Sequence, residues 1–142
     1  MTGSISYVRL LGCIVLCEGA GIVAGILTAQ SVRTWYPMLH KPWFTPPGWV
    51  FGPTWTLLYL LMGISLYIVW TNREVDKGKR TALFIFFIQL TLNALWISIL
   101  LTVMFFWRLS QAAAYLLVPY FFWSTFAGVL NFSIWSLNRA TG

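Results

Sequence analysis

Residues 35–59 read WYPMLHKPWFTPPGWVFGPTWTLLY, a stretch that concentrates Trp and Pro in a loop and at the start of an apolar helix. Trp suits the membrane interface, because its ring is apolar while its N–H remains in contact with water. The prolines hold the loop in extended and turn conformations, so that it needs little ordering on binding. The stretch therefore predicts the rim and one wall of a ligand pocket in a helical membrane protein. The predicted lid loop covers residues 29–47, and its candidate site residues are Trp35, Trp43, Pro46 and Pro47.

The composition of the chain is that of an integral membrane protein. Of its 142 residues 59% are hydrophobic and 8% are charged, and the mean hydropathy is +0.78. Soluble domains carry roughly 25% charged residues, so this chain lacks the means to cover a water-facing surface. The net charge of +6 comes from basic residues in short loops between apolar runs, which argues against a nucleic-acid partner and for the lipid bilayer. We expect one all-α transmembrane domain over residues 1–142.

Four apolar spans can be counted, at about residues 8–28, 48–70, 81–101 and 112–137. The polar segment NREVDKGKR (residues 72–80) is the most basic loop, so we place it in the cytoplasm and the 29–47 loop outside. Residues 81–107 form an unbroken apolar run of 27 residues, about 40 Å as one helix. That run is too long for one transmembrane helix perpendicular to the membrane and too short for two transmembrane helices.

Polar side chains inside the predicted spans are the first candidates for function. Glu18 is the acidic residue within a span, and a carboxyl group there is costly unless it faces the bundle interior. It is either a protonated group that is hydrogen-bonded to a neighbouring helix, or a polar contact in a pocket or pathway. Gln89 and Asn93 are spaced i, i+4 and share a helix face, with Trp96 on the same stripe. Two amides in hydrocarbon need partners in the bundle or on a ligand.

Aromatic stripes recur on two further spans. Trp55, Tyr59 and Met62 lie on one face of the second span, and Tyr120, Trp123 and Ala127 follow the same spacing on the last span, with Asn131 one turn on. Any one stripe is explained by core packing. Stripes on three spans that converge instead favour a pocket for a large planar ligand, lined by flat rings and a few hydrogen-bonding groups.

The remaining motifs favour structural roles. Cys13 and Cys17 lie one helical turn apart and read as packing residues, and the spacing of the chain predicts no metal site. His40 is a solvated loop residue or, less readily, an axial ligand of haem. Gly21 and Gly25 form a small-xxx-small pair, which permits close packing within one subunit or a dimer contact. No catalytic set is identifiable, so a binding protein is preferred over an enzyme.

The chain resembles the tryptophan-rich sensory protein/translocator protein family, also known as the peripheral benzodiazepine receptors. The resemblance rests on the following residues: Trp35-Tyr36, Leu39, Lys41-Pro42, Trp43, Pro46-Pro47, Trp55, Leu58-Tyr59, Met62-Gly63, Asn93-Ala94-Leu95-Trp96, Val118-Pro119-Tyr120, Trp123 and Leu130-Asn131-Phe132. It implies a five-helix bundle, usually dimeric, that needs no cofactor and binds porphyrins such as protoporphyrin IX and haem, together with isoquinoline and benzodiazepine ligands.

By resemblance, the pocket residues are Trp55, Tyr59, Asn93, Trp123 and Ser124, and Trp43 and Pro47 belong to the lid. Some members of the family bind cholesterol through a motif that requires a Tyr at the end of the fifth helix. Phe132 stands at that position, so the sterol motif is incomplete.

The chain departs from the family pattern at the fourth helix, for which eleven residues remain between Trp96 and Arg108. The fourth helix is therefore missing or truncated, and we expect an internal segment to be absent near residues 98–101. The alternative is a rearranged four-span protein. Loss of one span would reverse the last helix in the membrane and bring Trp123 to the pocket from the wrong side.

Three functions follow from these patterns. The preferred one is a membrane receptor or transporter of tetrapyrroles, and the others are a porphyrin-degrading membrane enzyme and a scaffold without a ligand. The short loops favour a bacterial cell membrane, or the mitochondrial outer membrane if the source is eukaryotic.

Overall fold

A computed structural model describes residues 5–72, 78–92 and 96–139 of the chain, and these are almost entirely helical. The elements in order are α1 (Tyr7–Thr34), the short 3-10 helix η1 (Tyr36–Met38), α2 (Gly48–Thr71), α3 (Lys79–Leu92), α4 (Trp96–Leu109) and α5 (Gln111–Arg139). The expected all-α membrane fold with five helices is confirmed. Three of them, α1, α2 and α5, are long and apolar enough to cross a bilayer.

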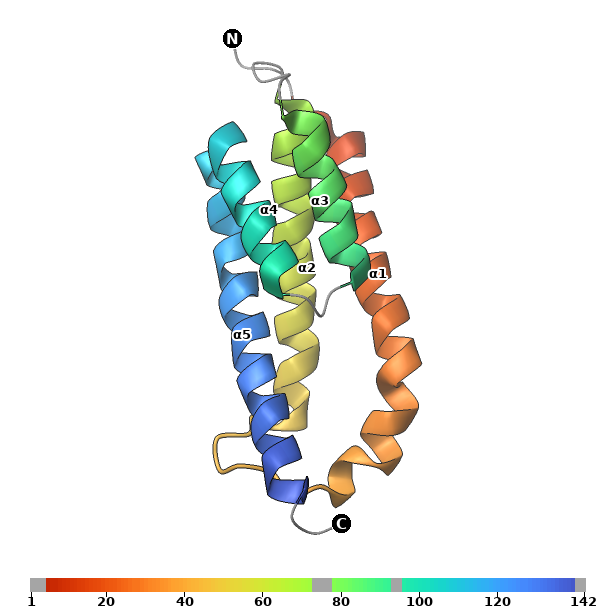
Figure 1. The fold of residues 1–142 in the computed structure, drawn as a ribbon. Helices are drawn as coiled ribbons and strands as arrows, with labels where there is room; N and C mark the ends of the chain where they lie inside the picture. The colour runs from red at the N-terminus through yellow and green to blue at the C-terminus, as the bar shows by residue number, and fades with distance from the viewer. Residues whose placement is uncertain (1–4, 73–77, 93–95, 140–142) are drawn as a thin grey trace.

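The predicted third span is two helices in the structure. Helices α3 and α4 have 14 residues each, which gives each a length of about 21 Å. Neither is long enough for a hydrocarbon core about 30 Å thick. Figure 1 shows them as an antiparallel hairpin that covers one half of the bundle and ends at mid-height of α2. The fourth helix is thus truncated, as predicted, but the third helix is shortened with it.

This pairwise shortening preserves the direction of α5. The hairpin of α3 and α4 returns to the end of the bundle from which it starts, so α5 begins there and runs to the end that carries residues 35–47 (Figure 1). We call the latter the lid end. The alternative of a rearranged four-span protein is therefore wrong, because two shortened helices, unlike one deleted span, leave the direction of the following helix unchanged.

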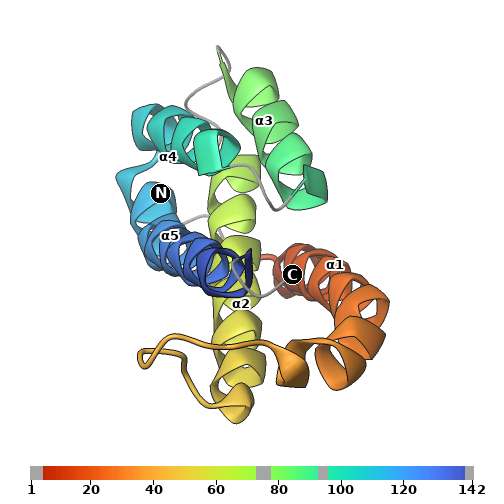
Figure 2. The same cartoon turned by 60° about the horizontal axis from the view of Figure 1, so that its bottom comes forward.

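Helix α2 lies at the centre of the bundle, between α1 and α5 (Figure 2). The approach to α1 is closest at Gly63, where an added Cβ would lie 2.6 Å from the Cα atom of Ile14. On the other side, the buried Ser65 hydroxyl donates a 2.8 Å hydrogen bond to the Ala113 carbonyl of α5. Cys13 and Cys17 are free and buried, which confirms their reading as packing residues.

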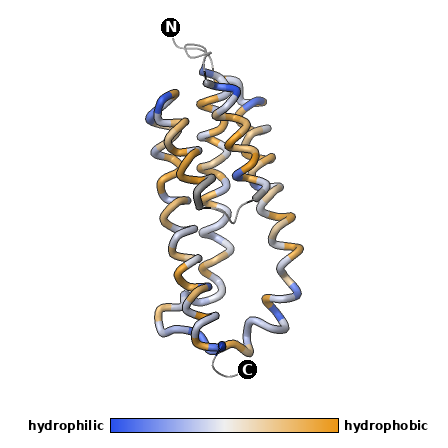
Figure 3. The backbone as a smooth tube through the Cα atoms, in the orientation of Figure 1, coloured by the Kyte–Doolittle hydropathy of each residue, from blue (hydrophilic) through white to orange (hydrophobic). Residues whose placement is uncertain are grey.

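The outside of the bundle is apolar along its length. Figure 3 shows hydrophobic residues on every helix, with hydrophilic positions gathered toward the two ends. Large hydrophobic side chains such as Val8, Ile26, Leu27 and Phe122 are more than half exposed, which is the surface that lipid requires. The protein is therefore a membrane protein.

The lid is fixed to the end of α5 at two places. The side chain of Asn138 accepts a hydrogen bond from the His40 N–H at 3.0 Å and donates one to the His40 carbonyl at 2.9 Å. Phe44 makes an edge contact with Phe126, with ring centroids 6.4 Å apart. Helix α1 continues to Thr34, six residues beyond the predicted span, so the lid is shorter than the predicted loop 29–47.

Candidate functional site

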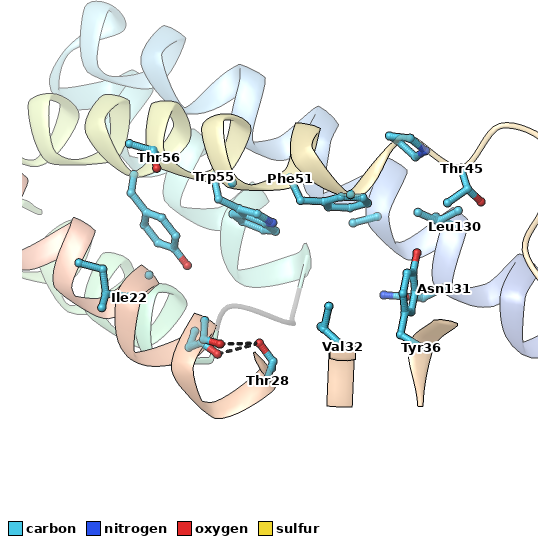
Figure 4. A pocket seen from close by; sticks show the side chains of 18 of the residues that line it. Ile22, Thr28, Val32, Tyr36, Thr45, Phe51, Trp55, Thr56, Leu130 and Asn131 are labelled. Carbon is cyan, nitrogen blue, oxygen red and sulfur yellow. Dashed lines mark hydrogen bonds between the residues drawn. The ribbon is translucent and has the colours of Figure 1, made fainter. Parts of the chain in front are cut away.

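A cavity of about 1000 Å³ lies between the lid-end halves of α1, α2 and α5 and the lid. Its size is at the upper end of ordinary ligand pockets. Figure 4 shows side chains from all four elements around it. The lining residues are Glu18, Gly21, Ile22, Ala24, Gly25, Thr28 and Val32 of α1, Tyr36, Lys41, Thr45 and Pro46 of the lid, Gly48, Phe51, Gly52, Trp55, Thr56 and Tyr59 of α2, and Ala127, Leu130 and Asn131 of α5.

The α2 wall is aromatic. Phe51, Trp55 and Tyr59 recur every four residues and line the cavity, and the rings of Trp55 and Tyr59 stack with centroids 5.8 Å apart at 30°. Tyr59 is 5% exposed, because Gly21 of α1 lies directly against its ring and a Cβ at that glycine would overlap it. The Trp55 and Tyr59 rings of the predicted stripe thus line the cavity together, and Gly21 confines the ring of Tyr59.

The α1 wall is made largely of small and aliphatic side chains on one helical face. A Cβ added at Gly25 would meet no atom within 4 Å, so this glycine widens the cavity. The small-xxx-small pattern had suggested that Gly25 packs against another helix. The hydroxyl of Thr28 donates within its own helix, to the carbonyls of Ala24 at 2.9 Å and Gly25 at 3.3 Å (Figure 4). Glu18 lines the cavity at the end farthest from the lid. The dimer contact suggested by Gly21 and Gly25 stays a prediction.

The lid and α5 supply the polar rim. The Lys41 ammonium group lies 4.8 Å from the centroid of the Tyr36 ring, a cation–π distance. Partial burial raises the pKa of the Tyr36 phenol, so the group is a neutral hydrogen-bond donor at neutral pH. Asn131 of α5 also lines the cavity, and Figure 4 shows it with Tyr36 among the lining side chains.

Several predicted site residues lie outside the cavity lining. Trp123 packs behind the wall, 5.9 Å from the ring of Phe51 and 5.5 Å from that of Phe126. Trp35 is 62% exposed and Trp43 is 95% exposed, and Pro47 is exposed as well. In the lid, Phe44 rather than Trp43 makes the contact with α5. Pro46 and Ala127 do line the cavity, together with Trp55, Tyr59 and Glu18.

Of the predicted polar residues, Gln89 and Ser124 belong to a buried polar cluster behind Trp55. The Gln89 amide of α3 donates a 3.1 Å hydrogen bond to the Tyr120 hydroxyl, and the ring of Tyr120 lies 6.4 Å from that of Trp55. Ser124 is also buried there. Trp55 of α2 and Gln89 of α3 thus both contact Tyr120 of α5. Of the predicted stripes, Trp55 and Tyr59 of α2 and Ala127 and Asn131 of α5 line the cavity. Asn93 lies outside the described residues, and Trp96 is the first residue of α4.

Metal ligation finds no support in the part of the chain that the structure describes, where no group of three His, Cys, Asp or Glu side chains gathers. His40 is exposed in the lid and is not a lining residue. The lining residues that sequence reasoning missed include Thr28 and Val32 of α1. Their signal was present, because they continue the spacing of three or four residues that begins with Glu18, Gly21 and Gly25.

Comparison with known proteins identifies relatives over most of the chain. The family model described as TspO/MBR matches residues 13–100 and 94–136. The chain is 40% identical to the tryptophan-rich protein TspO of Archaeoglobus fulgidus, over 94% of this chain and 99% of that protein. It is 32% identical to protein CrtK of Rhodobacter capsulatus, over 87% and 89% of the two chains, and 33% identical to the translocator protein of Bos taurus, over 82% and 85%.

The same comparisons locate the shortening. The two segments matched by the family model meet at residues 94–100, next to the place where the sequence predicts a missing segment. The alignment with the Archaeoglobus protein extends over 154 residues although the chain has 142, so that relative carries residues without a counterpart here. The family match is thus interrupted where α4 begins.

Proposed function

Since the chain belongs to the TspO/MBR family of membrane proteins, we propose that its cavity binds flat tetrapyrroles such as protoporphyrin IX and haem, and that it acts as their membrane receptor or transporter. Isoquinoline and benzodiazepine ligands are expected to compete for the same space. The observation that carries this proposal is the stacked pair Trp55 and Tyr59 facing a cavity of about 1000 Å³. Such a surface favours a planar conjugated ligand through offset stacking.

The charge at the lid supports an acidic ligand. Lys41 lines the cavity beside Tyr36, where its ammonium group can pair with the carboxylates at one edge of protoporphyrin IX. The apolar ring system then lies against Phe51 and Trp55. Because the 72–80 loop is the most basic, we place this lid on the outer side of a cell membrane.

Titration of the purified protein with protoporphyrin IX, followed by quenching of tryptophan fluorescence, tests the proposal. Trp55→Ala removes the stacking surface and is expected to weaken binding about tenfold or more, which corresponds to about 1.4 kcal/mol. Trp70→Ala is the matched control, because Trp70 lies on the same helix, is 52% exposed and does not line the cavity. Equal affinities of the two variants would overturn the assignment of the site.

A second ligand tests the role of the lysine. Protoporphyrin IX dimethyl ester has the same ring system without the carboxylates, so Lys41→Met should weaken binding of the acid and leave binding of the ester unchanged. Uptake into liposomes then separates transport from simple reception. Oxidised porphyrin in excess of the protein would instead support the porphyrin-degrading enzyme.

A further inference from the structure

The cavity has an acidic residue at one end and a basic residue at the other. Among the described lining residues Glu18 is the acidic one and Lys41 the basic one. Between them the α1 wall is Gly21, Ile22 and Gly25, and the facing wall is aromatic. A polar group at each end of an otherwise apolar cavity fixes both the orientation and the length of a ligand.

The side chains of Glu18 and Lys41 are too far apart to pair with each other. Lining residues follow one face of α1 from Glu18 to Val32, fourteen residues on, which corresponds to about 21 Å along the helix. Lys41 lies beyond that point, over the ring of Tyr36, which follows the end of α1. Glu18 therefore lies deep in a membrane-spanning helix, facing the cavity, without Lys41 as its partner.

We propose that the cavity selects an elongated amphiphile that has an acid group at the lid and a hydrogen-bond donor, an ammonium or N–H group, at the opposite end for Glu18. A carboxyl group without a hydrogen-bond partner within the bilayer raises the free energy of the protein. A ligand that supplies a donor to Glu18 removes this cost, whereas a ligand that ends in hydrocarbon does not. Glu18 is then a specificity-determining residue, because it disfavours the ligands it cannot pair with.

This inference rests on the cavity of the proposed function being a ligand site, but it does not require that the ligand be a tetrapyrrole. Hexadecanoic acid and ω-aminohexadecanoic acid are matched probes, because they share a carboxylate and a chain that extends over much of the cavity, and only the second carries a donor at its far end. Binding of each radiolabelled probe is measured on protein in nanodiscs, with protein-free nanodiscs subtracted.

The wild-type protein is expected to bind ω-aminohexadecanoic acid about tenfold more tightly than hexadecanoic acid, or better. Glu18→Gln should shrink that preference, because the charge is lost, and Glu18→Leu should abolish or invert it, because the apolar side chain suits the hydrocarbon end. Lys41→Met should weaken both probes to the same extent, since it acts on the carboxylate that they share. Equal binding of the two probes to the wild-type protein, or a preference that survives in both Glu18 variants, overturns the inference.

Protoporphyrin IX quenching in the same preparation separates this inference from the proposed function. Porphyrin binding without a probe preference retains the tetrapyrrole site and refutes the role of Glu18. A probe preference that depends on Glu18, without porphyrin binding, supports the role of Glu18 and refutes the tetrapyrrole site. Binding of neither porphyrin nor probe refutes both.

Discussion

Gly63 lies on α2 at its crossing with α1, and replacement by alanine should force the two helices apart. A Cβ at this position would lie 2.6 Å from the Cα atom and 3.0 Å from the N atom of Ile14, and 3.1 Å from the carbonyl oxygen of Cys13. All three are backbone atoms, so no side-chain rotation relieves the overlap. One of the two helices must shift instead.

The magnitude follows from two opposing effects. Alanine favours a helix over glycine by about 0.5–1 kcal/mol, whereas inserting a methyl group into a close-packed contact costs about 1–3 kcal/mol. Because the atoms at Gly63 are rigid, we expect Gly63→Ala to destabilise the protein by about 1–2 kcal/mol. Gly12 lies on α1 near the same crossing, but a methyl group added there would have nothing within 4 Å. Gly12→Ala should therefore stabilise the protein by up to about 1 kcal/mol.

The assay is reversible unfolding in mixed micelles of increasing SDS content, followed by helical circular dichroism. The same chemical change should move the midpoint down at Gly63 and up, or not at all, at Gly12. Two alanine variants that unfold at the same SDS fraction would show that the α1–α2 crossing is not the close contact described. Loss of stability at Gly12 alone would refute the reasoning in the same way.

Three further changes probe the lid, the aromatic wall and the α2–α5 contact. Asn138→Ala removes both hydrogen bonds to the backbone of His40, so release of protoporphyrin IX in stopped-flow measurements should become several-fold faster; an unchanged rate would show that this tether does not hold the lid. Gly21→Ala places a methyl group where the Tyr59 ring lies and should weaken porphyrin binding several-fold in the quenching titration, and undiminished affinity would contradict the stacked wall. Ser65→Ala loses a buried 2.8 Å hydrogen bond and should cost about 1 kcal/mol in SDS unfolding, whereas wild-type stability would mean that the bond makes no net contribution.

The sequence was sufficient for the membrane class and for the aromatic face of α2. These features depend on local composition and on one helical period, and Trp55 and Tyr59 lie where that period places them. The period also put Trp123 on a face with Tyr120, but it could not say which element covers that face. Phe51 lies between Trp123 and the cavity, and a covering side chain from another helix leaves no trace in the spacing of α5.

The division of the third span was harder to predict because hydropathy does not record it. The apolar run from residue 81 to residue 107 is continuous, yet the structure ends α3 at Leu92 and starts α4 at Trp96. The length of the run was the informative quantity. Two helices that stop at mid-height need fewer residues than two full spans need, and more residues than a single span needs. The contacts between α3 and α4, such as the Phe86–Phe106 stack with centroids 5.6 Å apart, are long-range and cannot be read from either helix alone.

The shortened hairpin lies outside the cavity. The described cavity residues come from α1, the lid, α2 and α5, and none comes from α3 or α4. Helix α3 packs mainly against α4, and α4 packs mainly against α5, while α1 meets α2 in the most extensive contact of the bundle. Removing length equally from both members of the hairpin leaves α5 pointing toward the lid, so Asn138 still reaches His40 and closes the cavity. Removing the same number of residues from one helix would turn α5 around and separate these groups by the thickness of the membrane.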